Sequence, residues 1–259
     1  MVTGIERFRE AFEDFVDNYI IIGGTACDIL LDDSDSVEPR ATTDIDMILV
    51  VENINPEFGR RFWQFIEKGE YKTRQRKRGE GQSPVPELFR FIKPQNGYPV
   101  QIELLSIQPD ILGEPTGFHL TPIPLGEELS SLSAILMDRD CYEFTLSNSV
   151  VENGVRIASP VALIALKSRA YLNLVEEKKR NPKVRSRDIK KHRMDVFLLM
   201  SEFRRSDRVS LPPSLSYTLR VFTDEIEKAL PIQSLQDSLE VGEETIREYI
   251  SIMREVFGL

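Results

Sequence analysis

The sequence predicts an α/β (α+β) protein, in which a small mixed sheet flanked by helices is followed by a helical C-terminal domain. Two observations predict this class. Short apolar runs rich in β-branched residues, bounded by turn signals, recur in the first part of the chain, beginning at Tyr19 and at Asp44. Beyond about residue 158 the apolar residues recur at helical spacing only. We therefore expect one domain over residues 1–158 and a second over residues 159–259.

The composition is ordinary for a globular protein. The chain has 259 residues, of which 41% are hydrophobic and 29% charged. Its two cysteines are too few for a disulfide framework. No apolar run approaches the roughly 20 residues that span a bilayer, and the acidic, amphipathic start lacks the features of a secretory signal. These features predict a cytoplasmic protein with no membrane partner.

The first strand, Tyr19–Ile22, ends on two glycines. Gly23 and Gly24 come directly before a helix that Thr25 is expected to cap. Glycines at such a position allow a phosphate to approach the backbone, next to the free N–H groups of the helix. A tight turn between a strand and a helix is the alternative reason for them.

The boundaries of the remaining elements are marked by proline and glycine. Asp44–Val51 reads as a buried strand, and Pro56 opens a helix. Asn96-Gly97 and Asn153-Gly154 each predict a β-hairpin. Ser159, as an N-cap before Pro160, marks the start of a long helix. The expected C-terminal helices cover residues 160–177, 187–205, 213–229 and 243–257.

Three acids on two predicted strands are candidates for a metal site. Asp44 and Asp46 are two residues apart, so both side chains project from the same face of their strand. Glu103 lies on the second strand of the Asn96-Gly97 hairpin, and it joins the aspartates if that strand lies beside theirs. Oxygen ligands of this kind suit Mg²⁺, and three carboxylates can hold two ions. A polar junction between a loop and a strand is the alternative explanation for the aspartates.

Lys167 lies in the apolar stripe of the helix that follows Ser159. A lysine that points inward needs an anionic partner, such as a nucleotide phosphate or a carboxylate. Alternatively, its side chain reaches solvent along its apolar stem. Asp188 and Asp195 are seven residues apart on the next helix and share a face. For Asp188 the alternative is an acid that complements the helix dipole in the first turn.

The order of these motifs resembles the nucleotidyltransferase fold of the polymerase-beta superfamily. That family has a Gly-Gly or Gly-Ser turn opening a helix, an Asp-x-Asp strand, and a third acid on a later strand. The matching residues here are Gly23, Gly24, Asp44, Asp46 and Glu103. The polar stretch "DDSDSVEP" lengthens the usual spacing between the glycines and the aspartates, and the third acid is Glu where many members have Asp.

The downstream segments resemble the AbiEii-type toxin nucleotidyltransferases. "ASPVALIALKSRAYLNL" and "RSRDIKKHRMDVF" match the helix that carries a lysine after the core and the following helix that carries an acid. The match identifies Lys167 and Asp188 as catalytic candidates, with Asp195 as a further one.

The resemblance implies transfer of a nucleoside monophosphate from an NTP to an acceptor, with release of pyrophosphate. Two ions of Mg²⁺ or Mn²⁺ are expected. Their expected ligands are Asp44, Asp46 and Glu103. The residues expected to hold the triphosphate are Gly23, Gly24, Thr25 and Lys167. The second domain would close the active-site cleft.

Two basic segments lie on a chain whose net charge is −9. Lys72–Arg78 has five cations in seven residues, and Lys178–Arg193 has nine cations and a single acid. Both suit a phosphate backbone, and the toxin family implies an RNA acceptor, such as a tRNA end, and an antitoxin partner. The alternatives are solvated basic surfaces, a small-molecule or protein hydroxyl as acceptor, and a catalytically silent module that binds nucleotide or a partner.

Overall fold

The protein is described from a computed structural model, which covers residues 3–31, 42–76, 85–105 and 139–259. The chain divides into two compact units. The first comprises Met1–Leu136 and Ser149–Ala158, and the second comprises Met137–Asn148 and Ser159–Leu259. Residues 137–148 thus belong to the second unit and not, as expected from the sequence, to the first domain. Within the described residues, no helix has both the length and the apolar character needed to cross a membrane.

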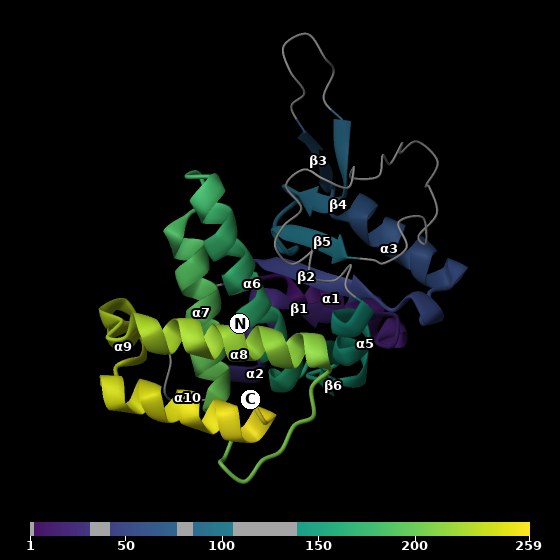
Figure 1. The fold of residues 1–259 in the computed structure, drawn as a ribbon. Helices are drawn as coiled ribbons and strands as arrows, with labels where there is room; N and C mark the ends of the chain where they lie inside the picture. Colours follow the sequence, from purple (N-terminus) through teal and green to yellow (C-terminus); the bar gives the residue numbers. More distant parts are fainter. Residues whose placement is uncertain (1–2, 32–41, 77–84, 106–138) are drawn as a thin grey trace. The chain divides into compact units, whose positions relative to one another are not determined.

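The first unit is built on a seven-stranded mixed sheet (Figure 1). In spatial order the strands are β3 (Lys72–Arg76), β4 (Val85–Ile92), β5 (Gln101–Leu105), β2 (Asp44–Leu49), β1 (Tyr19–Ile22), β7 (Val155–Ala158) and β6 (Ser149–Glu152). Strand β1 is parallel to β7 and β2 is parallel to β5, whereas the other neighbouring strands are antiparallel. The predicted mixed sheet and its two hairpins, β4–β5 and β6–β7, are confirmed.

Aromatic side chains cover one face of this sheet. They come from α1 (Ile5–Phe12), its 3₁₀ extension η1 (Glu13–Phe15) and α3 (Pro56–Lys68). The Phe8 ring meets the Tyr19 ring of β1 at a centroid distance of 5.2 Å, and the Phe62 ring meets Phe91 of β4 at 5.5 Å. Side chains alternate along a strand. The residues next to Tyr19 in β1 and next to Phe91 in β4 therefore point to the opposite face of the sheet.

Helix α2 (Gly23–Leu31) starts directly after β1, without an intervening turn. The prediction that Thr25 caps this helix is wrong, because the helix already includes Gly23 and Gly24 and Thr25 lies in its first turn. The Thr25 hydroxyl donates instead to the backbone carbonyl oxygen of Asp44. This bond joins the start of α2 to the start of β2.

The second unit is helical. Its members are α5 (Arg139–Ser147), α6 (Pro160–Arg180), α7 (Ser186–Met200), α8 (Pro213–Ala229), α9 (Gln233–Leu239) and α10 (Glu243–Phe257). The predicted helices over 213–229 and 243–257 are confirmed with the same bounds, and the helix predicted over 187–205 ends at Met200 instead. Helices α5 and α9 and strand β3 were not predicted. Strand β3 (KTRQR) contains no apolar residue that could show an alternation.

Candidate functional site

Two carboxylates project from the start of β2. Asp44 and Asp46 are half-buried, whereas Ile45 and Met47 between and beyond them are fully buried. Ile45 and Met47 belong to the face that the aromatic side chains cover, so the two aspartates lie on the other face. The sequence prediction that both acids share one face of a strand is confirmed by this alternation.

Gly23 lies directly against one of these carboxylates. Its φ is +74°, and a Cβ atom added to it would lie 2.5 Å from Oδ2 of Asp46. A side chain at this position would therefore displace the carboxylate or the backbone. The strand register explains the proximity, because Ile22, the residue before Gly23, pairs with Asp46 across β1 and β2. The acid pair and the first turn of α2 thus meet at one point.

The first turn of α2 offers backbone donors. The first N–H groups of a helix have no partner within the helix, and they carry the positive end of its dipole. Gly24 follows Gly23 in this turn. Thr25 is fully buried and its hydroxyl is bound to Asp44, so its side chain is committed to the protein. Thr25, one of the four residues predicted to hold the triphosphate, can therefore contribute only its backbone.

Asp44 is oriented by its own neighbours. The Thr43 hydroxyl donates to Asp44 Oδ1 at 3.0 Å, and the Thr43 carbonyl oxygen accepts from the backbone N–H of Val100 at 2.9 Å. These contacts connect the start of β2 to the segment before β5. They stabilise the aspartate side chain on the face that also carries Asp46.

Glu103 is on the same face but is held by an arginine. Parallel pairing of β2 with β5 places it opposite Asp46, as predicted. Its two oxygens accept from Arg90 of β4, with Nε to Oε2 at 3.2 Å and Nη2 to Oε1 at 2.9 Å. Both side chains are largely buried, with exposed fractions of 17% for Arg90 and 11% for Glu103.

Arg90 was not among the predicted site residues, although the predicted hairpin contained the signal for it. Counting outward equally from Asn96-Gly97 places Arg90 opposite Glu103, and this is the register of β4 and β5. Arg90, Glu103 and Asp46 thus form a row across three neighbouring strands.

The fit of the predicted metal site is partial. Asp44 and Asp46 supply hard oxygen donors of the kind that Mg²⁺ prefers. Glu103 is a poorer ligand than the aspartates, because Arg90 donates to both of its oxygens and offsets its charge. Consistently, the described residues contain no group of three or more His, Cys, Asp or Glu side chains that could hold an ion.

Lys167 is buried in the second unit and has an acidic partner there. Its Nζ lies 2.7 Å from Oδ2 of Asp195, and the two side chains are only 2% and 3% exposed. The inward orientation inferred from the apolar stripe is confirmed. The ion pair between α6 and α7 provides the anion that a buried lysine needs.

Asp188 lies at the start of α7. Its Oδ2 accepts from Nε of Arg185 at 2.9 Å, and its side chain is 35% exposed. The structure thus separates the environments of Asp188 and Asp195, although both lie on α7. The position of Asp188 matches the alternative of an acid in a first helical turn.

The two basic segments have different structures. Lys178–Arg193 covers the end of α6 and the start of α7, and most of its cations are exposed. Lys72–Arg78 falls on the edge strand β3 up to Arg76, whereas residues 77 and 78 lie outside the described residues.

Comparisons with known proteins find little similarity. No family model matches the chain, and no curated protein matches it significantly. Among solved structures, the chain is similar to the crystal structure of an antigenic nucleotidyltransferase-like protein from Paracoccidioides brasiliensis. The match has 16% sequence identity and a TM-score of 0.39, and it covers 90% of this chain and 93% of that chain. A TM-score of this size establishes no family, so the function is inferred from the chain's own residues.

Proposed function

We propose that the protein is a metal-dependent nucleotidyltransferase, which moves a nucleoside monophosphate from an NTP to an acceptor hydroxyl. One observation carries the proposal: Gly23, at the start of α2, lies directly against the carboxylate of Asp46. A turn that can bind phosphate and an acid pair that can bind a divalent cation therefore meet. A metal-bound triphosphate needs both.

Each residue has a distinct role in this proposal. Asp44 and Asp46 would hold Mg²⁺ or Mn²⁺, which neutralises phosphate charge when it is bound. The backbone N–H groups at the start of α2 would bind phosphate oxygens, and Gly23 and Gly24 leave room for them. The acceptor oxygen bonds to the α-phosphorus, the bond from that phosphorus to its bridging oxygen breaks, and pyrophosphate leaves. A carboxylate of β2 would accept the hydroxyl proton.

The downstream candidates keep their predicted roles as proposals only. The role of Lys167 at the triphosphate stays a prediction, and its ion pair with Asp195 supplies the anion that a buried lysine needs. Asp188, which is paired with Arg185, is the weaker candidate because a structural role already accounts for it.

An RNA acceptor, such as a tRNA end, is favoured by the segment Lys178–Arg193. Its exposed cations include Lys183, Arg187 and Lys190, on a chain with a net charge of −9. A local excess of positive charge on an acidic protein attracts a phosphate backbone while the rest of the surface repels it. The antitoxin partner implied by the resemblance stays a prediction.

The test is transfer of label from each α-³²P-labelled NTP, in the presence of Mg²⁺ and total cellular RNA. We compare the wild type with Asp44→Asn/Asp46→Asn and with a matched control, Glu13→Gln/Asp14→Asn, which removes two exposed acids of the same unit. Label in an RNA band, present with the wild type and the control and absent with the β2 variant, is the expected result.

Other outcomes identify the alternatives. Label in the protein band or in a small product indicates a protein or small-molecule acceptor. Unchanged NTP, although the NTP binds in a Mg²⁺-dependent manner, indicates a binding module without turnover. Absence of both binding and transfer would rule out the proposed function.

A further inference from the structure

Arg90 and Glu103 form a two-point ion pair in the row of polar side chains on β2, β5 and β4. The guanidinium contacts the carboxylate through Nε at 3.2 Å and through Nη2 at 2.9 Å. Two parallel hydrogen bonds of this kind fix both groups in one plane and are stronger than neutral hydrogen bonds. Arginine keeps its charge at any pH at which the protein is folded.

The partners are held in place by the sheet. Arg90 and Glu103 are directly opposite each other in the antiparallel β4–β5 pair. On the other face, Phe91 and Ile102 are 1% and 0% exposed, so the two strands are anchored by buried side chains beside the pair. The pair itself is mostly shielded from solvent. Breaking it would leave a carboxylate that is 11% exposed without its charged partner, which is costly.

A carboxylate bound in this way differs from a free metal ligand. The pair of oxygens that a divalent cation would coordinate already accepts two charge-assisted hydrogen bonds. The four side chains Asp44, Asp46, Glu103 and Arg90 carry two net negative charges, which one divalent cation neutralises. Without the arginine, the three acids would carry three negative charges, and binding of a second cation would then be favoured.

We infer that Arg90 takes the place of a second metal ion in this site, so that the protein binds one divalent cation on Asp44 and Asp46. The inference rests on the proposed function, because it concerns the same site. Arg90 is a positioning residue in this scheme: it holds Glu103 and places a fixed positive charge beside Asp46. Glu103 is then neither a metal ligand nor the base.

The number of bound ions tests this inference independently of turnover. Mn²⁺ is titrated into the full-length protein with each of the four α,β-methylene nucleoside triphosphates in turn, which cannot transfer the nucleotide. Electron paramagnetic resonance counts the bound ions. It also separates an isolated ion from a coupled pair, because ions about 3.5–4 Å apart interact magnetically.

The wild type is expected to bind one Mn²⁺ with an uncoupled spectrum, and Glu103→Gln is expected to do the same. Arg90→Gln frees Glu103 and is expected to bind two coupled ions. Because Arg90→Gln leaves a buried carboxylate without its arginine and can fail to fold, the double variant Arg90→Gln/Glu103→Gln is included. It removes both charges and is expected to bind one ion. Arg61→Gln, at an exposed position of α3 in the same unit, is the matched control.

Two coupled ions in the wild type, reduced to one by Glu103→Gln, would overturn the inference and leave the proposed function standing. Two ions in the double variant would also overturn it, since Glu103 could not then be the added ligand. A wild type that binds no Mn²⁺ with any of the four analogues would overturn both.

Discussion

Gly23 has a conformation and a neighbour that both exclude a side chain. Its positive φ disfavours any residue with a Cβ atom, and the Asp46 carboxylate occupies the space that a Cβ would take. The same residue therefore shapes the backbone and makes room for the acid. This is a sharper role than that of a flexible turn between a strand and a helix.

Gly23→Ala is therefore expected to displace the Asp46 carboxylate. We expect a loss of about 1–3 kcal/mol in the free energy of unfolding, because alanine is strained at this φ. Mn²⁺ affinity should fall by about tenfold or more, since a displaced neighbour misorients a ligand. Urea denaturation and Mn²⁺ titration measure the two effects.

Gly242→Ala is the matched control for this prediction. A Cβ atom at Gly242 meets no atom within 4 Å, and its φ is −78°. The control should change stability by about 1 kcal/mol or less and leave Mn²⁺ affinity unchanged. Unaltered Mn²⁺ binding by Gly23→Ala would show that Asp46 does not need the space at Gly23.

The Lys167–Asp195 ion pair predicts a large stability effect. Asp195→Asn leaves the buried ammonium without the charge that lies 2.7 Å away. The free energy of unfolding should fall by about 3–5 kcal/mol. Lys167→Met/Asp195→Leu replaces both charges by apolar groups and should recover most of this loss. Urea denaturation of the variants measures these changes. Equal losses of unfolding free energy in the single and the double variant would contradict the interpretation.

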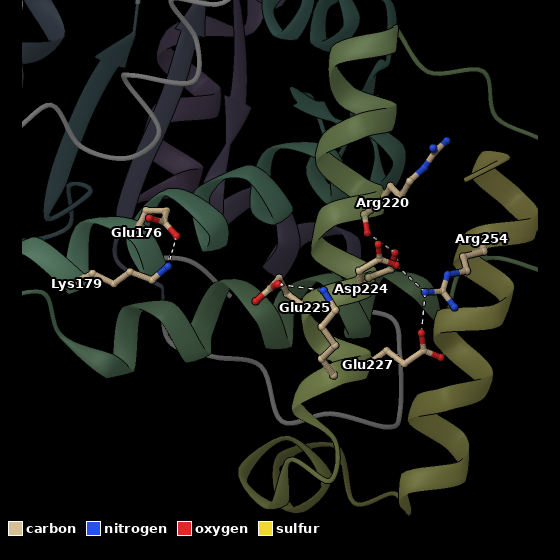
Figure 2. Close-up of polar contacts among 9 residues, drawn as sticks. Glu176, Lys179, Arg220, Asp224, Glu225, Glu227 and Arg254 are labelled. Carbon is tan, nitrogen blue, oxygen red and sulfur yellow. Dashed lines mark hydrogen bonds and ion pairs between the residues drawn. The ribbon is translucent and has the colours of Figure 1, made fainter.

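At the scale of elements, one arginine connects two helices of the second unit. Figure 2 shows Arg254 of α10 between two acids of α8: Nη2 lies 2.9 Å from Oδ1 of Asp224 and 2.8 Å from Oε2 of Glu227. In the same view Glu176 and Lys179 form an ion pair within α6. The contacts of Arg254 join two helices that are separate in the sequence, whereas the Glu176–Lys179 pair lies within one helix.

The Arg254 contact predicts a pH dependence. Its hydrogen bond to Glu227 is the main cause that lowers the pKa of that carboxyl. A lowered pKa in the folded state gives stability that is present above the unfolded-state pKa and is lost as pH falls through the folded-state value. The melting temperature of the wild type should therefore exceed that of Glu227→Gln at neutral pH, and the difference should shrink as the pH falls and the carboxyl becomes protonated.

Glu202→Gln is the control for this titration, because Glu202 is exposed and lies between helices of the second unit. Its difference from the wild type should change less with pH. A difference between the wild type and Glu227→Gln that stays constant from neutral to acidic pH would rule out the Arg254 contact as its source.

At the scale of the whole molecule, the attraction of RNA depends more on how charge is distributed along the chain than on the net charge. The chain is acidic overall, yet the segment Lys178–Arg193 gathers exposed cations where α6 ends and α7 begins. Some of them are neutralised locally, as Arg185 is by Asp188. A surface of this kind predicts RNA binding that weakens steeply with salt.

Lys183→Ala/Arg187→Ala/Lys190→Ala tests this surface. Each lost phosphate contact should reduce the slope of log affinity against log salt concentration by about 0.7 to 0.9. Fluorescence anisotropy with labelled tRNA at several salt concentrations measures the slope. Arg60→Ala/Arg61→Ala/Lys68→Ala removes three exposed cations from α3 and the same total charge. An equal effect of both triple variants would indicate attraction by net charge alone.

The period of the apolar pattern and the residues that form tight turns are local properties of the chain. The structural features that depend on them were therefore predictable from the sequence. The two-residue period put Asp44 and Asp46 on one face, and Asn96-Gly97 set the β4–β5 register. The long C-terminal helices were predictable because each presents several turns of one apolar stripe. Strand β3 was missed because its sequence, KTRQR, contains no apolar residue that could show an alternation, and helix α9 was missed because it has only seven residues.

The identities of the contacting partners were decided by tertiary structure. The sequence indicated a need for an anion near Lys167, and the fold supplied Asp195. The fold also gave Glu103 a partner, Arg90, that was not predicted. The placement of Gly23 against Asp46 likewise depends on the register of β1 and β2. Burial makes an unpaired charge costly wherever it occurs, so a need for a partner is visible in sequence. Which partner meets that need depends on distances of a few ångströms between residues far apart in the chain, and only the folded sheet and helices fix those distances.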